Sequence, residues 1–274
     1  MTASEYLQKL IDKKANSNTY TQNETQAKLQ IHQWINEWRQ SFNTGSYWSS
    51  ISIDVQLSGS RAKGTSLKGK SDMDLFVSIT DTNNERTPKE YYDSLYNFLK
   101  PKLKNDMRKQ NVSLGLEYAG CDIDITPAKK LNSQSYSRNM WEKFNDHYLW
   151  QNKKQRRFKT NIQKHMDLVQ QYGRQKEIML IKMWRNCHNL ELPSIYIEIL
   201  ASEVLGKRDY SSDLWQDTKK LLIALRDTIY TRAIIDPSNS ENCISDSIDD
   251  GEKEMISKSA RNTLNEQYLE QMIW

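Results

Sequence analysis

The sequence predicts an α+β fold, with a mixed sheet in the N-terminal half and an all-helical lobe in the C-terminal half. Between residues 51 and 128, short segments alternate apolar and polar residues or run apolar between turn residues, as strands do. After residue 150, apolar residues recur at helical spacing instead. We therefore expect two domains, residues 1–150 with N-terminal helices and residues 151–274, and an active site in the cleft between them.

Residues 3–14 and 22–42 are predicted to form the two N-terminal helices. The segment ISIDVQL, residues 51–57, then places every second residue on one apolar face and predicts a strand. In the second helix, apolar residues near one stripe predict a face that packs against the core: Leu29, Trp34, Ile35, Trp38 and Phe42.

Three more strands and a helix are predicted before residue 130. Residues 73–79 form an apolar strand, and residues 87–104 open with Thr-Pro and continue as a helix. Residues 111–120 and 121–128 read as two further strands, the second of which we expect Pro127 to end.

The C-terminal half is expected to contain helices within four segments: 157–186, 193–205, 213–234 and 252–273. The run QNKKQRRFK, residues 151–159, is basic and includes Phe158 beside the preceding Trp150. This run is a candidate contact for nucleic acid or an acidic product, although charge runs usually mark solvated faces.

Composition restricts the classes of function. Of the 274 residues, 27% are charged and 37% hydrophobic, as in ordinary globular proteins. The net charge of +4 is too small for a general nucleic-acid coat, so any anion binding should be local. The three cysteines are widely separated, which excludes a disulfide framework and a CxxC zinc site. Because neither a membrane span nor a signal peptide is evident, we expect a cytoplasmic protein that does not enter a membrane.

Two closely spaced aspartates, Asp72 and Asp74, are unusual at the start of an apolar strand. Residues i and i+2 of a strand point to the same face, with Cα atoms about 7 Å apart, so the two carboxylates repel unless a cation lies between them. Magnesium suits carboxylate oxygens. A third carboxylate is expected to share the metal, and the alternation of the strand at 121–128 leaves Asp122 and Asp124 equally placed.

The loop before the pair has the character of a phosphate loop. Gly59 allows the backbone to approach a ligand, and Ser60 adds a hydroxyl. The segment GSRAKGTS is not a P-loop, because no lysine follows its second glycine directly.

The pattern GS-x(3)-GT-x(6)-D-x-D, formed by residues 59–74, resembles the polymerase-beta nucleotidyltransferase superfamily. Within it the match is closest to the branch of archaeal-type CCA-adding enzymes, oligoadenylate synthetases, cyclic GMP-AMP synthase and bacterial CD-NTases. These families carry a third aspartate in a stretch like hDhhP, where h is apolar, and residues 123–127 match it. The resemblance therefore selects Asp124 over Asp122. It extends over residues 50 to 245, including DPSNSEN near the C-terminus.

The resemblance also implies two phosphate contacts in the C-terminal half. Lys182, in IKMWRN, resembles a lysine that contacts the triphosphate, and Ser194 resembles a serine at the start of the next helix. From the residues alone, Lys182 would be interpreted as a surface lysine. Ser194 follows Pro193 in a predicted first turn, where free N–H groups favour an anion.

What the resemblance implies is a metal-dependent nucleotidyltransferase. Asp72, Asp74 and Asp124 would hold two Mg²⁺ or Mn²⁺ ions and act in catalysis, while Gly59, Ser60, Lys182 and Ser194 would bind the nucleotide. Such an enzyme joins nucleoside triphosphates, ATP among them, into a cyclic di- or trinucleotide or short linear second messenger and releases pyrophosphate.

The likeness to CD-NTases implies a role in bacterial anti-phage defence (CBASS), with a downstream effector protein bound only through the product. No zinc thumb is present, so sensing of double-stranded DNA is not expected. The alternatives are a linear oligonucleotide or tRNA-end nucleotidyltransferase, and an inactive scaffold with the same fold.

Overall fold

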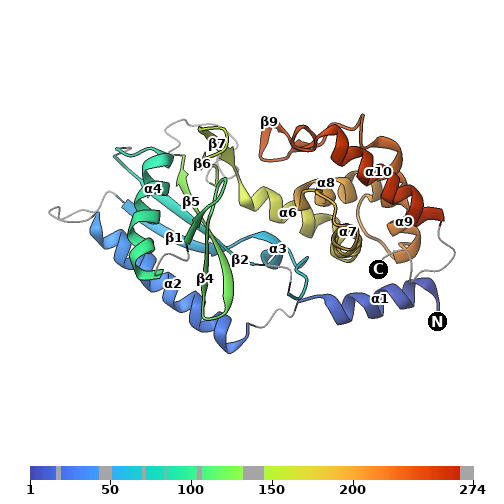
Figure 1. Ribbon diagram of the computed structural model, residues 1–274, viewed down its shortest axis with the longest axis horizontal. Coiled ribbons are helices and arrows are strands. Elements are labelled where there is room, and N and C mark those ends of the chain that lie inside the picture. The colour runs from blue at the N-terminus through green and yellow to red at the C-terminus, as the bar shows by residue number, and fades with distance from the viewer. Residues whose placement is uncertain are drawn as a thin grey trace. The chain divides into compact units, whose positions relative to one another are not determined.

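The computed structural model describes residues 1–16, 20–42, 51–69, 72–83, 85–103, 107–131 and 145–265. The chain forms two compact units that interleave along the sequence (Figure 1). The sheet unit comprises Ser17–Ala62 and Ser71–Gln163, and the helical unit comprises Met1–Asn16, Lys63–Lys70 and Lys164–Trp274. The predicted boundary at residue 150 instead placed residues 1–16 and 63–70 with the sheet, and residues 151–163 with the helices.

The sheet unit is built on a mixed sheet, as the sequence predicts. Within the described residues the sheet has seven strands, ordered β1-β2-β5-β4-β3, with β6 joined to β5 and β7 to β6. Strands β2 and β5 are parallel, whereas the other pairs are antiparallel. The strands are β1 (Ile51–Leu57), β2 (Met73–Asp81), β3 (Met107–Lys109), β4 (Leu114–Tyr118), β5 (Cys121–Lys130), β6 (His147–Gln151) and β7 (Arg156–Thr160).

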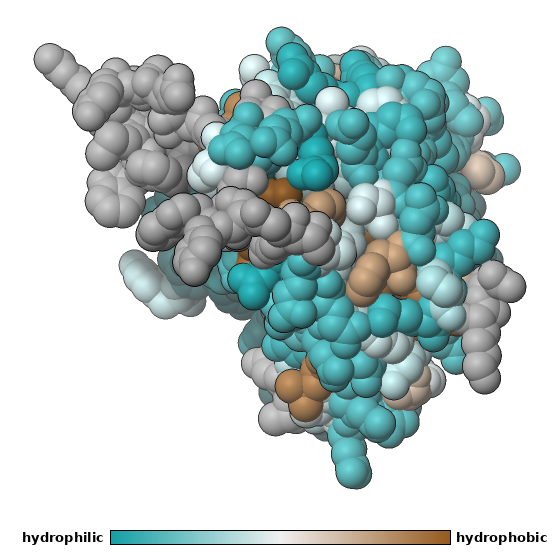
Figure 2. All heavy atoms as spheres, turned by 90° about the vertical axis from the view of Figure 1, so that its left-hand side faces the viewer, coloured by the Kyte–Doolittle hydropathy of each residue, from teal (hydrophilic) through white to brown (hydrophobic). Residues whose placement is uncertain are grey.

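Helices α2 (Gln22–Ser41) and α4 (Pro88–Leu99) pack on the sheet and share one apolar core with β1, β2, β4 and β5. Both begin at a capping box, in which a threonine and the glutamate three residues later satisfy each other's backbone N–H groups. Two shorter elements complete the unit, α3 (Gly59–Ala62) and the 3-10 turn η1 (Lys100–Leu103). The surface seen in Figure 2 is mainly hydrophilic, with small separate hydrophobic areas.

The buried stripe of α2 differs in part from the predicted one. Ala27, Ile31, Ile35 and Trp38 are buried at spacings of four, four and three residues, which follow one helix face. Leu29 is wrong as a core residue, since 67% of it is exposed. It lies two positions from Ala27, about 200° around the helix and thus on the opposite side.

Pro127 does not end β5, contrary to the prediction. The strand continues to Lys130, with Pro127 paired to Val77 of β2. On its other edge, β5 pairs with β4 only as far as Ile125 and with β6 only from Lys129. At residue 127 this edge of β5 therefore has no neighbouring strand among the described residues, so a proline, which lacks a backbone N–H, loses no hydrogen bond to a partner on that side.

The helical unit contains α1 (Ala3–Lys14) and five further helices within the described residues: α6 (Ile162–Tyr172), α7 (Gln175–Cys187), α8 (Ser194–Leu205), α9 (Leu214–Thr228) and α10 (Asp250–Asn265). Helix α6 starts at the end of the sheet unit. The core of the helical unit lies mainly among α7, α8, α9 and α10. No helix in the described ranges is long and apolar enough to cross a membrane.

Three predictions for the C-terminal half need correction. Residues 157–160 belong to strand β7 rather than to a helix, since they pair with β6 at the edge of the sheet. The long helix predicted up to residue 186 is divided at Gly173, whose φ of +65° ends α6. The half is also not all helical, since β8 (Ile235–Asp236) and β9 (Asn239–Cys243) form a hairpin, followed by the 3-10 turn η2 (Ile244–Ser247). Of the helix predicted at 252–273, residues 266–273 lie outside the described ranges.

Candidate functional site

The two segments with alternating aspartates lie side by side in the sheet. Strands β2 and β5 are parallel, and their register pairs Asp74 with Asp124. Residues paired in this way share a face of the sheet, with Cα atoms about 4.8 Å apart. Asp72 precedes β2 by one residue, so the same register extends from it toward Asp122. The sheet therefore gathers four carboxylates at the start of two neighbouring strands.

These carboxylates influence one another electrostatically. Partial burial, and then the charge of Asp122, raises the pKa of Asp72. Burial and the charge of Asp72 likewise raise the pKa of Asp124. Arg108 of β3 opposes both shifts. Burial and then repulsion between the carboxylates therefore disfavour the ionised forms of Asp72 and Asp124.

Asp124 is held by a polar contact that the sequence did not reveal. Gln110 donates a hydrogen bond from Nε2 to Asp124 Oδ1 at 2.9 Å, and Ser113 donates to Gln110 Oε1. Gly115 of β4 lies opposite Asp124. A Cβ atom at Gly115 would lie 2.5 Å from Gln110 Nε2 and 3.2 Å from Asp124 Oδ1. The glycine inside the strand SLGLEY was the available signal, because a glycine there often marks a close approach.

Gly59 brings the predicted phosphate loop against the second aspartate. It has a φ of +65°, and a Cβ atom at this position would lie 1.8 Å from Asp74 Oδ2. Just before it, Ser58 donates its N–H to the Asp74 carbonyl oxygen at 2.9 Å. Ser60 is the next residue of the short helix α3. Gly59 therefore meets both conditions that exclude a side chain, a left-handed backbone and an occupied space.

Lys182 is a buried residue of the helical unit, and the interpretation as a surface lysine is wrong. Only 3% of it is exposed. Its Nζ donates to Thr65 Oγ1 at 2.9 Å and lies 3.4 Å from Glu198 Oε1. Lys63 binds the other oxygen of Glu198 at 2.7 Å. Two lysines thus share one carboxylate beside the Gly64-Thr65 dipeptide of the motif.

The surroundings of Lys182 explain its electrostatics. Burial lowers the pKa of its ammonium group, Glu198 opposes this shift, and Lys63 adds to it. Sequence reasoning missed Lys63 and Glu198. Glu198 interrupts the apolar run IYIEILA much as Lys182 interrupts IMLIKMW, and two opposite charges in apolar helices indicate a buried pair.

Ser194 begins α8 and so lies in the predicted first turn. Its side chain contacts Arg185 rather than Lys182. Its Oγ accepts a hydrogen bond from Arg185 Nη1 at 3.1 Å, and the same nitrogen donates to the Leu192 carbonyl oxygen at 2.8 Å. The predicted site residues therefore form two groups. Gly59, Asp74 and Asp124 belong to the sheet unit, while Lys182 and Ser194 belong to the helical unit.

The aspartates fit a divalent cation in their donor chemistry. Carboxylate oxygens are the preferred ligands of Mg²⁺. Burial and then a neighbouring carboxylate raise the pKa values of Asp72 and Asp124, and a bound cation would favour their ionised forms. Among the described residues, no three His, Cys, Asp or Glu side chains are gathered closely enough to form a metal site as they stand.

The chain is similar in fold to several solved proteins that are distant from it in sequence. CdnC of E. coli MS115-1, solved with ATP, has 16% identity and a TM-score of 0.69, with 98% of this chain and 94% of that chain covered. DncV of Vibrio cholerae, a cyclic AMP-GMP synthase, has 12% identity and a TM-score of 0.59, with 99% and 83% covered. A cytoplasmic RNA terminal U-transferase has 11% identity and a TM-score of 0.59, with 99% and 97% covered. At these identities the likeness shows the fold. No curated protein sequence matches the chain.

A family model gives the finer assignment. It is described as the Second Messenger Oligonucleotide or Dinucleotide Synthetase domain (SMODS), and it matches residues 1–165. That match spans more than half of the chain and contains Gly59, both strands that carry the aspartates and the sheet that aligns them. Motif, fold and family model agree, and the chain is thus a nucleotidyltransferase that belongs to the SMODS family.

Proposed function

We propose that this enzyme joins nucleoside triphosphates into a cyclic di- or trinucleotide, or a short linear oligonucleotide, that serves as a second messenger. The observation that carries the proposal is the register of β2 and β5, which pairs Asp74 with Asp124 and leaves Asp72 beside them. Three carboxylates on one face are the ligand set that two-metal nucleotidyl transfer requires.

Each aspartate has a proposed role. Asp72 and Asp74 hold both metal ions, Mg²⁺ or Mn²⁺, and Asp124 holds one of them. Asp124 also accepts the proton of the attacking hydroxyl, in an orientation fixed by the hydrogen bond from Gln110. When bound, the two ions activate that hydroxyl and stabilise the charge of the departing pyrophosphate.

The triphosphate is bound by Gly59, Ser60, Lys182 and Ser194 in this proposal. Support for Lys182 comes from its cluster, in which two ammonium groups share the single carboxylate of Glu198. The cluster keeps an excess of positive charge in a buried place, where an anion is attracted strongly. Support for Gly59 is its lack of a side chain beside Asp74.

The proposed biology follows from the family. A SMODS domain is by its description a synthetase of second messenger oligonucleotides or dinucleotides, and CdnC of similar fold was solved with ATP. We take ATP as one substrate and anti-phage defence in the bacterial cytoplasm as the setting. A downstream effector protein would bind the product alone, and double-stranded DNA would not be an activator.

A product analysis tests the proposal. The protein is incubated with each labelled triphosphate and with mixtures, in Mg²⁺ and in Mn²⁺, then treated with phosphatase and analysed by mass spectrometry. A cyclic product has no terminal phosphate and survives the phosphatase at full mass, whereas a linear product loses its terminal phosphates. Asp74→Asn is the control. Absence of any new phosphodiester in all mixtures would contradict the proposal and favour an inactive scaffold.

A second candidate is addition of nucleotides to the end of an RNA, as in a linear or tRNA-end nucleotidyltransferase. It is favoured by the RNA terminal U-transferase, of which 97% is covered by the similarity. Incubation with a labelled RNA primer and each triphosphate separates the two. If the primers are extended stepwise and no product forms without a primer, the protein adds nucleotides to RNA ends and the first proposal is wrong.

A further inference from the structure

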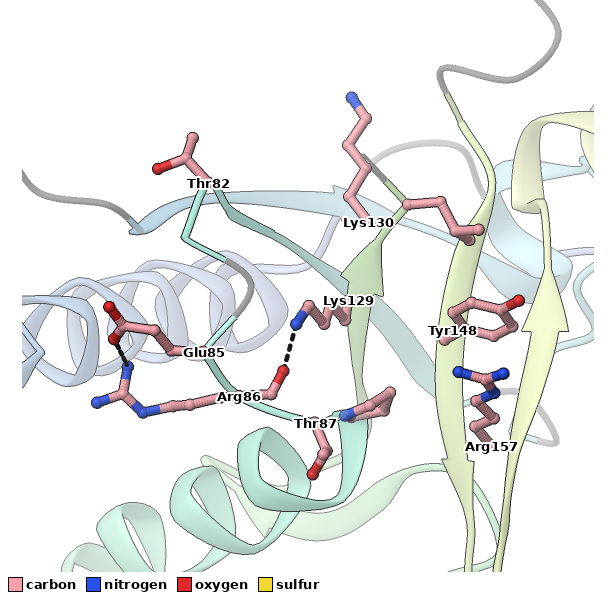
Figure 3. Close-up of a pocket in the computed structure, with 10 residues that line it drawn as sticks. Thr82, Glu85, Arg86, Thr87, Lys129, Lys130, Tyr148 and Arg157 are labelled. Carbon is pink, nitrogen blue, oxygen red and sulfur yellow. Dashed lines mark hydrogen bonds and ion pairs between the residues drawn. The ribbon is translucent and has the colours of Figure 1, made fainter. Parts of the chain in front are cut away.

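A pocket lined by several basic side chains lies in the sheet unit (Figure 3). Its volume is about 550 Å³. The turn after β2, the start of α4, the end of β5 and the β6–β7 hairpin form its walls. The lining residues that carry charge or an aromatic ring are Glu85, Arg86, Lys129, Lys130, Tyr148 and Arg157.

The pocket and the aspartates occupy opposite ends of the same two strands. Asp124 lies near the start of β5, whereas Lys129 and Lys130 end it. From Asp124 to Lys129 the strand advances about 17 Å at 3.3 Å per residue. A ligand bound in the pocket would therefore not share the proposed catalytic site.

The lining carries four cationic side chains and one carboxylate. Two of the cations are already engaged. The ammonium group of Lys129 donates to the Arg86 carbonyl oxygen and lies 3.5 Å from Asp81 Oδ2. The guanidinium of Arg86 lies 3.9 Å from Glu85 Oε2 and 4.9 Å from the ring centroid of Phe42.

The other two cations, Lys130 and Arg157, form no ion pair with any residue that the structure describes. The Arg157 guanidinium instead lies over the Tyr148 ring, 4.8 Å from its centroid. Figure 3 shows this stack across the pocket from the turn that carries Glu85 and Arg86. The pocket thus combines two charges available to phosphate oxygens with an aromatic ring and a guanidinium group, both of which can contact a base.

The basic run 151–159 continues this positive surface beyond the pocket. Lys153, Lys154 and Arg156 are exposed on the hairpin whose strands carry Tyr148 and Arg157, and they do not line the pocket. Their charges would raise the local concentration of an approaching anion without fixing its position. Within this run, Arg157 can therefore bind an anion inside the pocket, whereas the exposed cations can only attract the anion toward it.

We propose that this pocket is a second, noncatalytic binding site for a nucleoside polyphosphate. The phosphates lie against Lys130 and Arg157, and the base lies against the stack of Arg157 on Tyr148. A volume of about 550 Å³ lies within the range of roughly 300–1,000 Å³ that small-molecule sites occupy. A longer nucleic acid would instead depend on the exposed cations of the hairpin, which lie outside the pocket.

Paired charge reversals test the proposal. Lys130→Glu with Arg157→Glu removes the two available cations of the pocket. Lys153→Glu with Lys154→Glu makes the same change in net charge on the hairpin outside it. Binding of ATP to the full chain is measured by calorimetry in EDTA, and equal melting temperatures of the variants verify folding. We expect the pocket variant to lose at least about tenfold in ATP affinity at one site, and the hairpin variant to lose less than about threefold.

Several outcomes overturn the proposal. Equal losses in both variants would mean a diffuse electrostatic surface, and no loss in the pocket variant would mean that ATP binds elsewhere. Tight binding of a 20-nucleotide single strand without binding of ATP would assign the surface to a nucleic acid. Photolabelling with 8-azido-ATP in EDTA gives independent support when the labelled peptide contains Tyr148. Label confined to peptides containing Gly59 or Asp74 contradicts the second site.

Discussion

At the scale of single residues, two glycines make room for the aspartates. Gly59 excludes a side chain where Asp74 lies, and Gly115 leaves space for the contact between Gln110 and Asp124. Both glycines were visible in the sequence. Only Gly59 belonged to a motif, and the need for Gly115 depends on the pairing of β4 with β5.

Gly59→Ala is expected to abolish activity and to destabilise the sheet unit. The new Cβ would lie 1.8 Å from Asp74 Oδ2, so the aspartate or the turn must move. Gly69→Ala is the matched control, because Gly69 has the same φ of +65° but no heavy atom within 4 Å of its added Cβ. The control isolates the strain of a left-handed backbone, about 1–2 kcal/mol. Equal activity and equal unfolding midpoints in urea for both variants would contradict a role for Gly59 beside Asp74.

Lys182→Ala is expected to raise the Michaelis constant for the nucleotide while the fold survives. Losing one charge-assisted bond costs on the order of 1.5–3 kcal/mol, or roughly ten- to hundredfold in affinity. Glu198 still has Lys63 as a partner at 2.7 Å in this variant. Calorimetric nucleotide affinity equal to that of the wild type would show that Lys182 has a structural role only.

At the scale of the elements, local sequence patterns predicted most helices and strands. They did not predict features that depend on the pairing of distant strands. The helices α1, α2 and α4 follow threonine capping boxes and periodic apolar residues, and β1 alternates over its full predicted length. Strand β7 was missed because the basic run that contains it has few apolar residues to show a period of two. The extension of β5 through Pro127 depends on which neighbouring strand faces that edge, which only the topology determines.

A buried histidine joins β6 to β2, and its lowered pKa predicts that the stability of the sheet unit depends on pH. His147 Nε2 lies 2.7 Å from Ser78 Oγ, and its Nδ1 lies 2.7 Å from the Asn145 carbonyl oxygen. Burial lowers the pKa of His147 to about 4. The unfolded chain, with an ordinary pKa near 6.5, binds a proton before the native state does. The contribution of His147 to stability is therefore full above pH 6.5 and is lost as the pH falls toward 4.

His147→Gln is expected to remove this pH dependence. From the pKa shift, the wild type should lose on the order of 3 kcal/mol between pH 7 and pH 4 through this group. The free energy of unfolding of both proteins is measured in urea across that range, and their difference isolates His147 from the acidic residues. A difference that does not change with pH would mean that His147 is not neutral in the folded protein.

At the scale of the whole molecule, the interleaving of the two units could not be predicted from composition. The segment from GS to DxD leaves the sheet unit after Ala62, contributes residues 63–70 to the helical unit and returns before β2. This path explains why one motif supplies both Gly59 beside Asp74 and Thr65 beside Lys182. The motif spacing and the hDhhP pattern indicated which residues are involved, but neither indicated which unit holds each of them.

The carboxylate array has a stability consequence that is separate from catalysis. Because the folded-state pKa of Asp124 is raised, ionising it costs stability as the pH rises above its ordinary value of 3.8. Asp124→Asn should therefore be at least as stable as the wild type at pH 7, with no gain below pH 3. Chemical denaturation at both pH values checks this, and a clear loss of stability at pH 7 would contradict the raised pKa of Asp124.

The most direct measurement compares pyrophosphate release by Asp122→Asn and Asp124→Asn, with Mg²⁺ and again with Mn²⁺. Both aspartates face the same side of β5, but only Asp124 pairs with Asp74, whereas Asp122 pairs with Glu117 of β4. Asp122 lies about 7 Å further along the strand, where the register continues toward Asp72, and the hDhhP resemblance assigns the third ligand to Asp124. We predict that Asp124→Asn abolishes release and that Asp122→Asn retains most of it. An active Asp124→Asn beside an inactive Asp122→Asn would contradict the assignment of the third carboxylate, and activity in both would contradict the two-metal mechanism itself.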